Sequence, residues 1–136
     1  MRTVRLAGCV IADEKGRILL IHRNTELFQH WELPGGKIEA NEREEQAAIR
    51  ELREELAVDV GIVRRLGGDM FTDKTGDYRY VWFLAKILSG EPRVGEPDKF
   101  DYWRFFAVEE LPDLNLSANM KKFLPKLQRK EIVLTP

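Results

Sequence analysis

Apolar residues along this chain fall into short runs that are separated by turn-forming residues. Runs of this kind predict β-strands, particularly where β-branched and aromatic residues are frequent. They lie at residues 4–12, 17–22, 60–71, 78–88 and 102–108. The first two runs flank the turn sequence Asp-Glu-Lys-Gly, so we expect them to form a hairpin. The fourth run is apolar on both sides, which predicts a central strand covered on both faces.

Two other segments have the periodicity of helices. Residues 42–57 contain no proline, and Asn41 is a suitable N-cap that can form a capping box with Glu44. Ser117 is expected to cap a second, amphipathic helix, which Pro125 should kink or shorten. Strands, a long helix, more strands and a last helix predict an α/β fold in which a mixed β-sheet is sandwiched between helices (α/β/α).

One face of the first predicted helix carries three glutamates, Glu51, Glu54 and Glu55. Like charges at these spacings repel each other, and they lie near the helix C-terminus, where the helix dipole favours cations. A divalent cation would remove this conflict, because clustered carboxylate oxygens are suitable ligands for Mg²⁺ or Mn²⁺. The alternative is an ordinary solvated acidic surface that Arg50 partly neutralises.

The composition limits the class of protein. The 136 residues suit one domain, which we expect to span residues 1–136. The formal net charge is −1 with both signs spread along the chain, which argues against a broad surface for nucleic-acid polymers or anionic membranes. The single cysteine, Cys9, excludes an internal disulfide and a cysteine-rich zinc site. Without a long apolar span or a signal-peptide pattern, we expect a cytoplasmic protein.

The spacing of residues around the acidic face is specific. Gly36 is followed after five residues by Glu42, after seven more by Arg50-Glu51, and then by Leu52, Glu54-Glu55 and Ala57-Val58. This resembles the box of the Nudix hydrolases, Gly-x5-Glu-x7-Arg-Glu-U-x-Glu-Glu-x-Gly-U, in which U is aliphatic. Weaker likeness to that family runs over nearly the whole chain. One fixed position departs, because alanine at 57 replaces the usual glycine, and Asp59 or Gly61 is then a candidate for ending the helix.

The resemblance implies the Nudix fold and roles for individual residues. Glu51, Glu54 and Glu55 would be metal ligands, together with a carbonyl of Gly35 or Gly36. Glu42 would pair with Arg50 and support the site.

The general base of Nudix hydrolases is either a glutamate of the box, here Glu51, or a glutamate of a later loop. Glu96 lies in the matching loop, and we place it first, both as the base and as a further metal ligand. Glu91 and Asp98 are alternatives in the same loop. Arg23 ends the second predicted strand, where an arginine of the family faces the substrate phosphates; a surface salt bridge is the alternative.

The remaining likeness is to MutT-type enzymes, which convert nucleoside triphosphates to monophosphates and pyrophosphate. Asn119 lies where these proteins carry a base-reading asparagine, although helix capping or surface exposure would equally explain it. Phe28, in an expected loop at residues 24–30, and Tyr78 are candidates for stacking on a base or for the core. We therefore expect a (deoxy)nucleoside triphosphate as substrate, including oxidised purine nucleotides.

Two other functions stay open at this point. One is a pyrophosphatase acting on ADP-ribose, nucleotide sugars or dinucleoside polyphosphates. The other is a nucleotide-sensing domain without catalysis, which would be expected to lose carboxylates that this box retains. We expect a small-molecule nucleotide substrate, Mg²⁺ or Mn²⁺ as cofactor, a monomer or homodimer, and neither a nucleic-acid polymer nor a membrane as partner.

Overall fold

The structure is a computed structural model that describes residues 3–135. Its elements are β1 (Val4–Ile11), β2 (Ile18–Asn24), β3 (Gln29–Glu32), β4 (Gly35–Lys37), α1 (Glu44–Leu56), β5 (Asp59–Asp73), β6 (Gly76–Ser89), β7 (Phe100–Phe106), the 3₁₀ helix η1 (Val108–Asp113) and α2 (Ala118–Gln128). The five predicted strands and both predicted helices are present. The short strands β3 and β4 and the helix η1 were not predicted.

The strands form two sheets instead of one. A four-stranded sheet has the order β4-β1-β6-β5, and a three-stranded sheet has the order β3-β2-β7. β1 runs parallel to β6 and antiparallel to β4, so both of its edges are occupied. The predicted hairpin of β1 and β2 is therefore wrong. Beyond a single bridge between Ala12 and Ile18, these two strands pair in different sheets.

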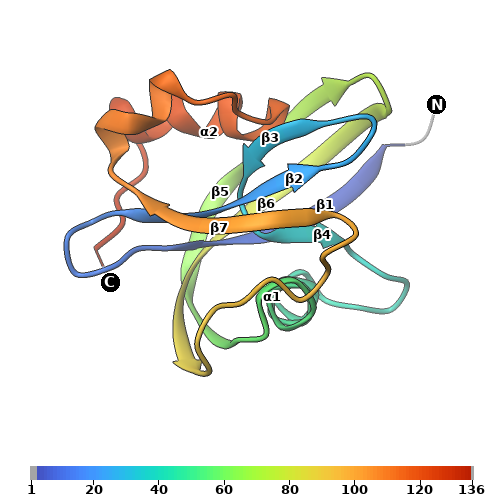
Figure 1. The fold of residues 1–136 in the computed structure, drawn as a ribbon, viewed down its shortest axis with the longest axis horizontal. Coiled ribbons are helices and arrows are strands. Elements are labelled where there is room, and N and C mark those ends of the chain that lie inside the picture. The colour runs from blue at the N-terminus through green and yellow to red at the C-terminus, as the bar shows by residue number, and fades with distance from the viewer. Residues whose placement is uncertain (1–2, 136) are drawn as a thin grey trace.

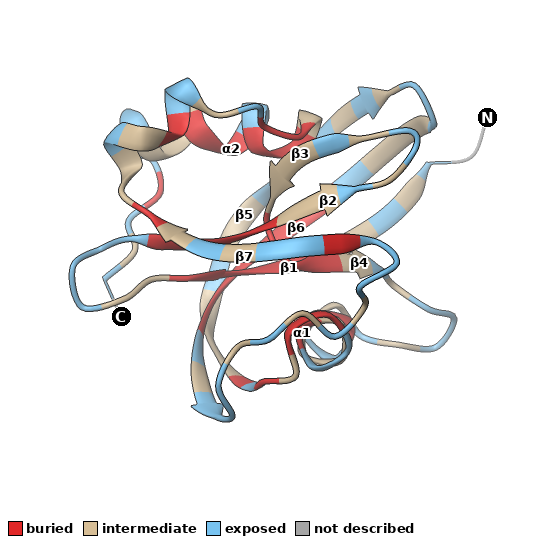
Figure 2. Ribbon diagram, in the orientation of Figure 1, coloured by how far each residue is buried: buried red, intermediate tan, exposed pale blue. Residues whose placement is uncertain are grey.

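The two sheets lie between α1 and α2 (Figure 1). Leu52 and Leu56 of α1 pack in one apolar cluster with Phe83 of β6, and Phe123 of α2 packs in a second cluster with Trp82. Burying one such side chain stabilises the fold by about 1.5–3 kcal/mol. Figure 2 shows the buried positions along the strands between the helices and on one side of each helix. The predicted class, mixed β-structure between helices, is confirmed.

The ends of α1 differ from the prediction. The N-cap is Arg43, whose backbone N–H donates to the side chain of Gln46 at 2.9 Å. Asn41 instead has a φ of 66° and lies in the turn before the helix, a position that asparagine tolerates as well as it tolerates a cap. At the other end, Ala57 itself adopts the left-handed conformation, with φ 58° and ψ 33°. Asp59 and Gly61, the predicted substitutes, belong to β5.

Two other predictions of local structure are wrong. The expected loop at residues 24–30 already contains the start of β3, which pairs with β2. Of the two predicted effects of Pro125, shortening is the wrong one, because α2 continues to Gln128. Phe123 and Leu124 are buried beside this proline, and their packing offsets the missing backbone donor. Ser117 caps α2 as predicted, since its side chain accepts from the N–H of Met120 at 3.2 Å. None of the helices within residues 3–135 has the length and apolar character needed to cross a bilayer.

Candidate active site

The three predicted metal ligands lie in the last two turns of α1, where it faces β4. Glu55 is buried and accepts a hydrogen bond of 2.7 Å from the backbone N–H of Gly35. The carboxylate of Glu51 lies against Gly36 so closely that a Cβ there would be 2.5 Å from the Glu51 Cδ. Glu54 is the outermost of the three, with 45% of its side chain exposed. The glycine pair therefore lets β4 approach the carboxylates directly.

Arg50 connects the carboxylates of this region through hydrogen bonds. Its guanidinium group donates to both carboxylate oxygens of Glu42, at 2.7 and 2.9 Å, and to the carbonyl of Lys37 at 2.9 Å. It also donates to Glu51 at 2.9 Å and to Glu54 at 3.2 Å. The hydrogen bonds from Arg50 lower the pKa of the Glu42 carboxyl to about 2. The pairing of Glu42 with Arg50 is thus present, and it joins the start of α1 to β4 and to two candidate ligands.

The charges on Glu51 and Glu55 are poorly compensated. Burial raises the pKa of the Glu55 carboxyl well above its usual range, and the nearby charges of Glu32 and Glu51 raise it further. Burial also raises the pKa of Glu51, although Arg50 opposes that effect. The Gly35 N–H is the single donor found for the Glu55 carboxylate within residues 3–135. A cation in reach of these oxygens would supply the missing charge.

The second oxygen of Glu55 is open to such a cation. Residues 3–135 provide no donor to this oxygen, and Glu55 as a whole is 3% exposed. No three His, Cys, Asp or Glu side chains of residues 3–135 converge into a complete metal site, and Arg50 donates hydrogen bonds to both Glu51 and Glu54. A partial set of carboxylates suits Mg²⁺, which keeps several waters and shares phosphate oxygens of the substrate.

The loop that carries Glu96 is fixed on the C-terminus of α1. The N–H groups of Gly95 and Arg93 donate to the carbonyls of Glu55 and Leu56, at 2.8 and 3.0 Å. Glu96 itself is half-buried, lies 3.5 Å from Lys99, and its charge contributes to the raised pKa values of Glu51 and Glu55. The structure therefore brings Glu96 to the carboxylate cluster. The alternatives Glu91 and Asp98 are exposed.

Arg23 is part of a half-buried network that the sequence did not reveal. Its Nε donates to Glu32 at 2.5 Å, and its guanidinium carbon lies 4.8 Å from the ring centre of Phe100. His30 also contacts Glu32, at 3.1 Å. Although burial opposes it, the hydrogen bond from His30 and the charge of Arg23 lower the pKa of Glu32. Arg23 is not a simple surface salt bridge, and the charges of Glu55 and Glu96 contribute to its raised pKa.

The three candidate base-binding residues lie apart from the carboxylates. Phe28 has the Lys74 ammonium 4.7 Å from its ring centre, and Tyr78 stacks on Phe71 at 5.0 Å. Asn119 is buried and neither caps α2 nor lies on the surface. Its side-chain oxygen accepts from the indole N–H of Trp82 at 3.0 Å.

Tyr80 is a further residue that the sequence pattern indicated only as part of an apolar strand. Its hydroxyl fills the space that side chains at Gly8 and Gly35 would occupy, since added Cβ atoms would lie 2.0 and 2.4 Å from it. These two glycines face each other across β1 and β4. The aromatic residue thus supports the strand that carries Gly35 and Gly36. No local sequence signal points to this contact, because it joins three separate strands.

The chain is similar to proteins of one family over nearly all of its length. The NUDIX domain model matches residues 2–127. An RNA pyrophosphohydrolase of Halorhodospira halophila is 32% identical in an alignment 132 positions long, and the match covers 76% of this chain and 68% of the relative. A putative 8-oxo-dGTP diphosphatase 2 of Mycobacterium tuberculosis is 42% identical in an alignment 96 positions long, and the match covers 68% of this chain and 67% of the relative.

A solved structure agrees with these relatives. The crystal structure of a MutT NUDIX hydrolase from Burkholderia pseudomallei superposes with a TM-score of 0.83 and 33% identity, covering 92% of this chain and 98% of that one. The match of the domain model, the relatives and the fold lead to the same family. The chain belongs to the Nudix hydrolases, and it is a pyrophosphohydrolase.

Proposed function

We propose that this enzyme hydrolyses a (deoxy)nucleoside triphosphate to the monophosphate and pyrophosphate, with Mg²⁺ as the metal. Nudix hydrolases generally use divalent metal ions. The observation that carries the proposal is the buried Glu55, whose charge has one backbone donor and lies among Glu32, Glu51 and Glu96. Folding alone disfavours such a cluster, whereas a cation beside a polyphosphate requires it.

Each residue of the site has a proposed role. Glu51, Glu54 and Glu55, with a carbonyl of Gly35 or Gly36, would hold the metal. A bound Mg²⁺ would neutralise phosphate charge and lower the pKa of a coordinated water. Arg50 would keep Glu51 and Glu54 in place while Glu42 anchors its guanidinium group. Arg23, paired with Glu32 at the end of β2, would bind phosphate oxygens of the substrate.

Glu96 is the proposed general base. Glu51, the alternative, accepts a hydrogen bond of 2.9 Å from Arg50, so one of its oxygens is already engaged. Glu96 has only the 3.5 Å contact with Lys99, and 25% of its side chain is exposed. A carboxylate that is near the cluster and accessible to water is better placed to orient and deprotonate the attacking water. Glu96→Gln should therefore lower kcat.

The orientation of Asn119 supports a guanine-type base. The Trp82 indole can only donate, so the Asn119 side chain turns its oxygen toward it. The amide nitrogen, for which residues 3–135 provide no acceptor, is then left as a donor for a ligand. Guanine offers an acceptor at O6, where adenine carries an amino group. The 42% identical relative named as an 8-oxo-dGTP diphosphatase is consistent with this preference.

A nucleotide panel tests the proposal. Purified protein with Mg²⁺ is incubated with dGTP, 8-oxo-dGTP and dATP, and products are identified by mass spectrometry. We expect pyrophosphate release from the guanine nucleotides, with lower rates for dATP, and loss of that difference in Asn119→Ala. Repeating the panel with Mn²⁺ tests the choice of metal independently of the choice of substrate.

The same panel includes the competing substrates. An RNA with a 5′-triphosphate is the second candidate, because the relative that covers 76% of this chain is named an RNA pyrophosphohydrolase. ADP-ribose and a diadenosine polyphosphate are also tested as substrates. If any of these three compounds is hydrolysed rapidly while the deoxynucleoside triphosphates are not hydrolysed, the proposed substrate is wrong.

A further inference from the structure

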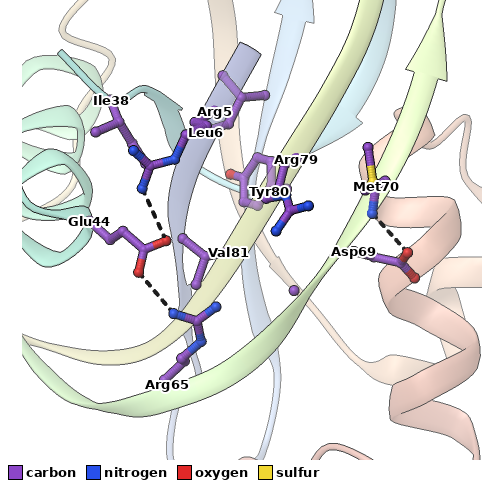
Figure 3. Close-up of a pocket in the computed structure, with 11 residues that line it drawn as sticks. Arg5, Leu6, Ile38, Glu44, Arg65, Asp69, Met70, Arg79, Tyr80 and Val81 are labelled. Carbon is purple, nitrogen blue, oxygen red and sulfur yellow. Dashed lines mark hydrogen bonds and ion pairs between the residues drawn. The ribbon is translucent and has the colours of Figure 1, made fainter. Parts of the chain in front are cut away.

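A hollow of about 300 Å³ lies beside the first turn of α1, over β1, β5 and β6 (Figure 3). This volume is at the lower end of the range for small-molecule sites, roughly 300–1,000 Å³. Three arginines line it, Arg5, Arg65 and Arg79. Apolar side chains, among them Ile38 and Val81, complete the lining. Arginines beside apolar side chains in one hollow indicate a ligand with both anionic and apolar parts.

The positive charge of the hollow is only partly compensated. Glu44 is 2.8 Å from Arg65 and 3.6 Å from Arg5, so one carboxylate serves two guanidinium groups. Asp69 also lines the hollow, but its carboxylate is 3.5 Å from Lys126 of α2. Within residues 3–135, Arg79 has no hydrogen-bond or ion-pair partner, and in Figure 3 it is joined to none of the residues drawn.

The hollow is distinct from the carboxylate cluster. Glu44 and Glu54 are ten residues apart on α1, which corresponds to about 15 Å along the helix axis. A single phosphoanhydride bond cannot reach both places. A ligand in the hollow is therefore either a second molecule or a distant part of a long substrate.

We propose that this hollow binds the phosphate group of a nucleotide. A guanidinium group presents paired donors that match phosphate oxygens, and Arg79 is free to provide them. Arg5 is beyond hydrogen-bond distance of Glu44 and can turn to the same phosphate. Ile38 and Val81 offer apolar contact for the ribose or base. The proposal is independent of which triphosphate the enzyme hydrolyses.

An NMR titration of the metal-free protein tests the binding. Inorganic phosphate, guanosine monophosphate and guanosine are added separately, and the backbone amides of Gly68 and Val81 are followed. Phosphate and the monophosphate should shift these amides, while guanosine at the same concentrations should not. Equal shifts with guanosine, or shifts confined to Gly36 and Glu54, would overturn the proposal.

Three substitutions make the test specific. Arg79→Ala should weaken binding of the monophosphate by about tenfold, since the charge-assisted hydrogen bonds of this guanidinium group to phosphate are lost. Arg104→Ala, at an exposed arginine of β7, is the matched control and should leave affinity unchanged. Glu44→Gln should strengthen binding, because its carboxylate competes with phosphate for Arg5 and Arg65. Weaker binding in Glu44→Gln, or equal losses in the two arginine variants, would contradict the assignment.

A final NMR titration identifies which kind of molecule carries the phosphate. A short RNA with a 5′-triphosphate is titrated beside guanosine monophosphate. Shifts of the same amides at tenfold lower concentration of the RNA assign the hollow to a phosphodiester chain that extends from the active site. Equal or weaker shifts with RNA assign it to a free nucleotide.

Discussion

At the scale of single residues, Glu55 lies in an environment that is unfavourable for the stability of the folded protein. It is buried, it accepts one backbone hydrogen bond, and burial raises the pKa of its carboxyl well above the usual range. A carboxyl with a raised pKa in the folded state stabilises the protein below its unfolded pKa. That stability is lost as the pH rises through the folded pKa. Without metal, Glu55 should therefore lower the stability of the protein near neutral pH.

Glu55→Gln should reverse this penalty and abolish activity. The amide keeps an oxygen for the Gly35 N–H but has no charge, so we expect the free energy of unfolding in EDTA to rise by about 0.5–2 kcal/mol at neutral pH. Turnover should fall more than about 100-fold, because losing a metal ligand lowers activity more than losing a residue that holds such a ligand in place. Urea unfolding with and without Mg²⁺ measures the first effect. Glu45→Gln, at an exposed position of the same helix, is the control. A metal-free variant less stable than the parent would contradict this assignment.

Glu42 should show the opposite dependence on pH. Hydrogen bonds from Arg50 lower the pKa of its carboxyl from 4.5 to about 2. The pairing therefore stabilises the fold above pH 4.5 and is lost as the pH falls toward 2. Glu42→Gln should cost about 1–2 kcal/mol at neutral pH, and the difference from the parent should narrow below pH 4.5. Urea titrations of both proteins at several pH values check this prediction. A difference in the free energy of unfolding that stays constant with pH would refute it.

Among the elements, α1 explains why the geometry of the candidate site was largely predictable. Glu51, Glu54, Glu55 and Arg50 lie on one continuous helix, so their spacing in the sequence fixes their relative positions. The network of Arg23, His30 and Glu32 depends on the pairing of β2 with β3, which a local pattern does not specify. The start of α1 was misplaced because Asn41 satisfies the rules for a turn and for a cap equally well.

The end of α1 offers a direct test. Ala57 adopts a left-handed conformation with φ 58°, which costs an L-residue with a Cβ about 1 kcal/mol. Ala57→Gly should raise the free energy of unfolding by about 0.5–1 kcal/mol and leave activity intact. Ala118→Gly, at the first residue of α2, should instead destabilise the protein. Thermal unfolding of both variants checks the contrast, and destabilisation by Ala57→Gly would be the contrary result.

For the whole molecule, the arrangement of strands was the least predictable feature. β1 pairs in parallel with β6, more than sixty residues later, and this long-range contact separates β1 from β2. The class of fold was nevertheless evident, because the order of strands and helices limits the possible layers. The segment after α2 had no predicted place. In the structure, Ile132 is buried in the apolar cluster of α2, and Arg64 of β5 donates to the carbonyls of Val133 and Thr135.

This C-terminal segment should contribute to global stability. Ile132→Ala removes buried methyl groups from the cluster around Trp82 and Phe123, so we expect a loss of about 2 kcal/mol. Val133→Ala is the matched control, because that side chain is 51% exposed and should change stability by less than about 0.5 kcal/mol. Chemical denaturation measures both. Equal effects of the two substitutions would show that the segment does not pack as described.

The contact between Gly95 and α1 has a consequence for the motions open to the enzyme. A Cβ at this position would lie 2.3 Å from the carbonyl oxygen of Glu54, so the loop backbone rests directly on the helix terminus. The proposed base and the proposed ligands are thereby joined through main-chain atoms and must shift as one body. Motions that admit substrate or release product must then come from elements other than α1 and this loop.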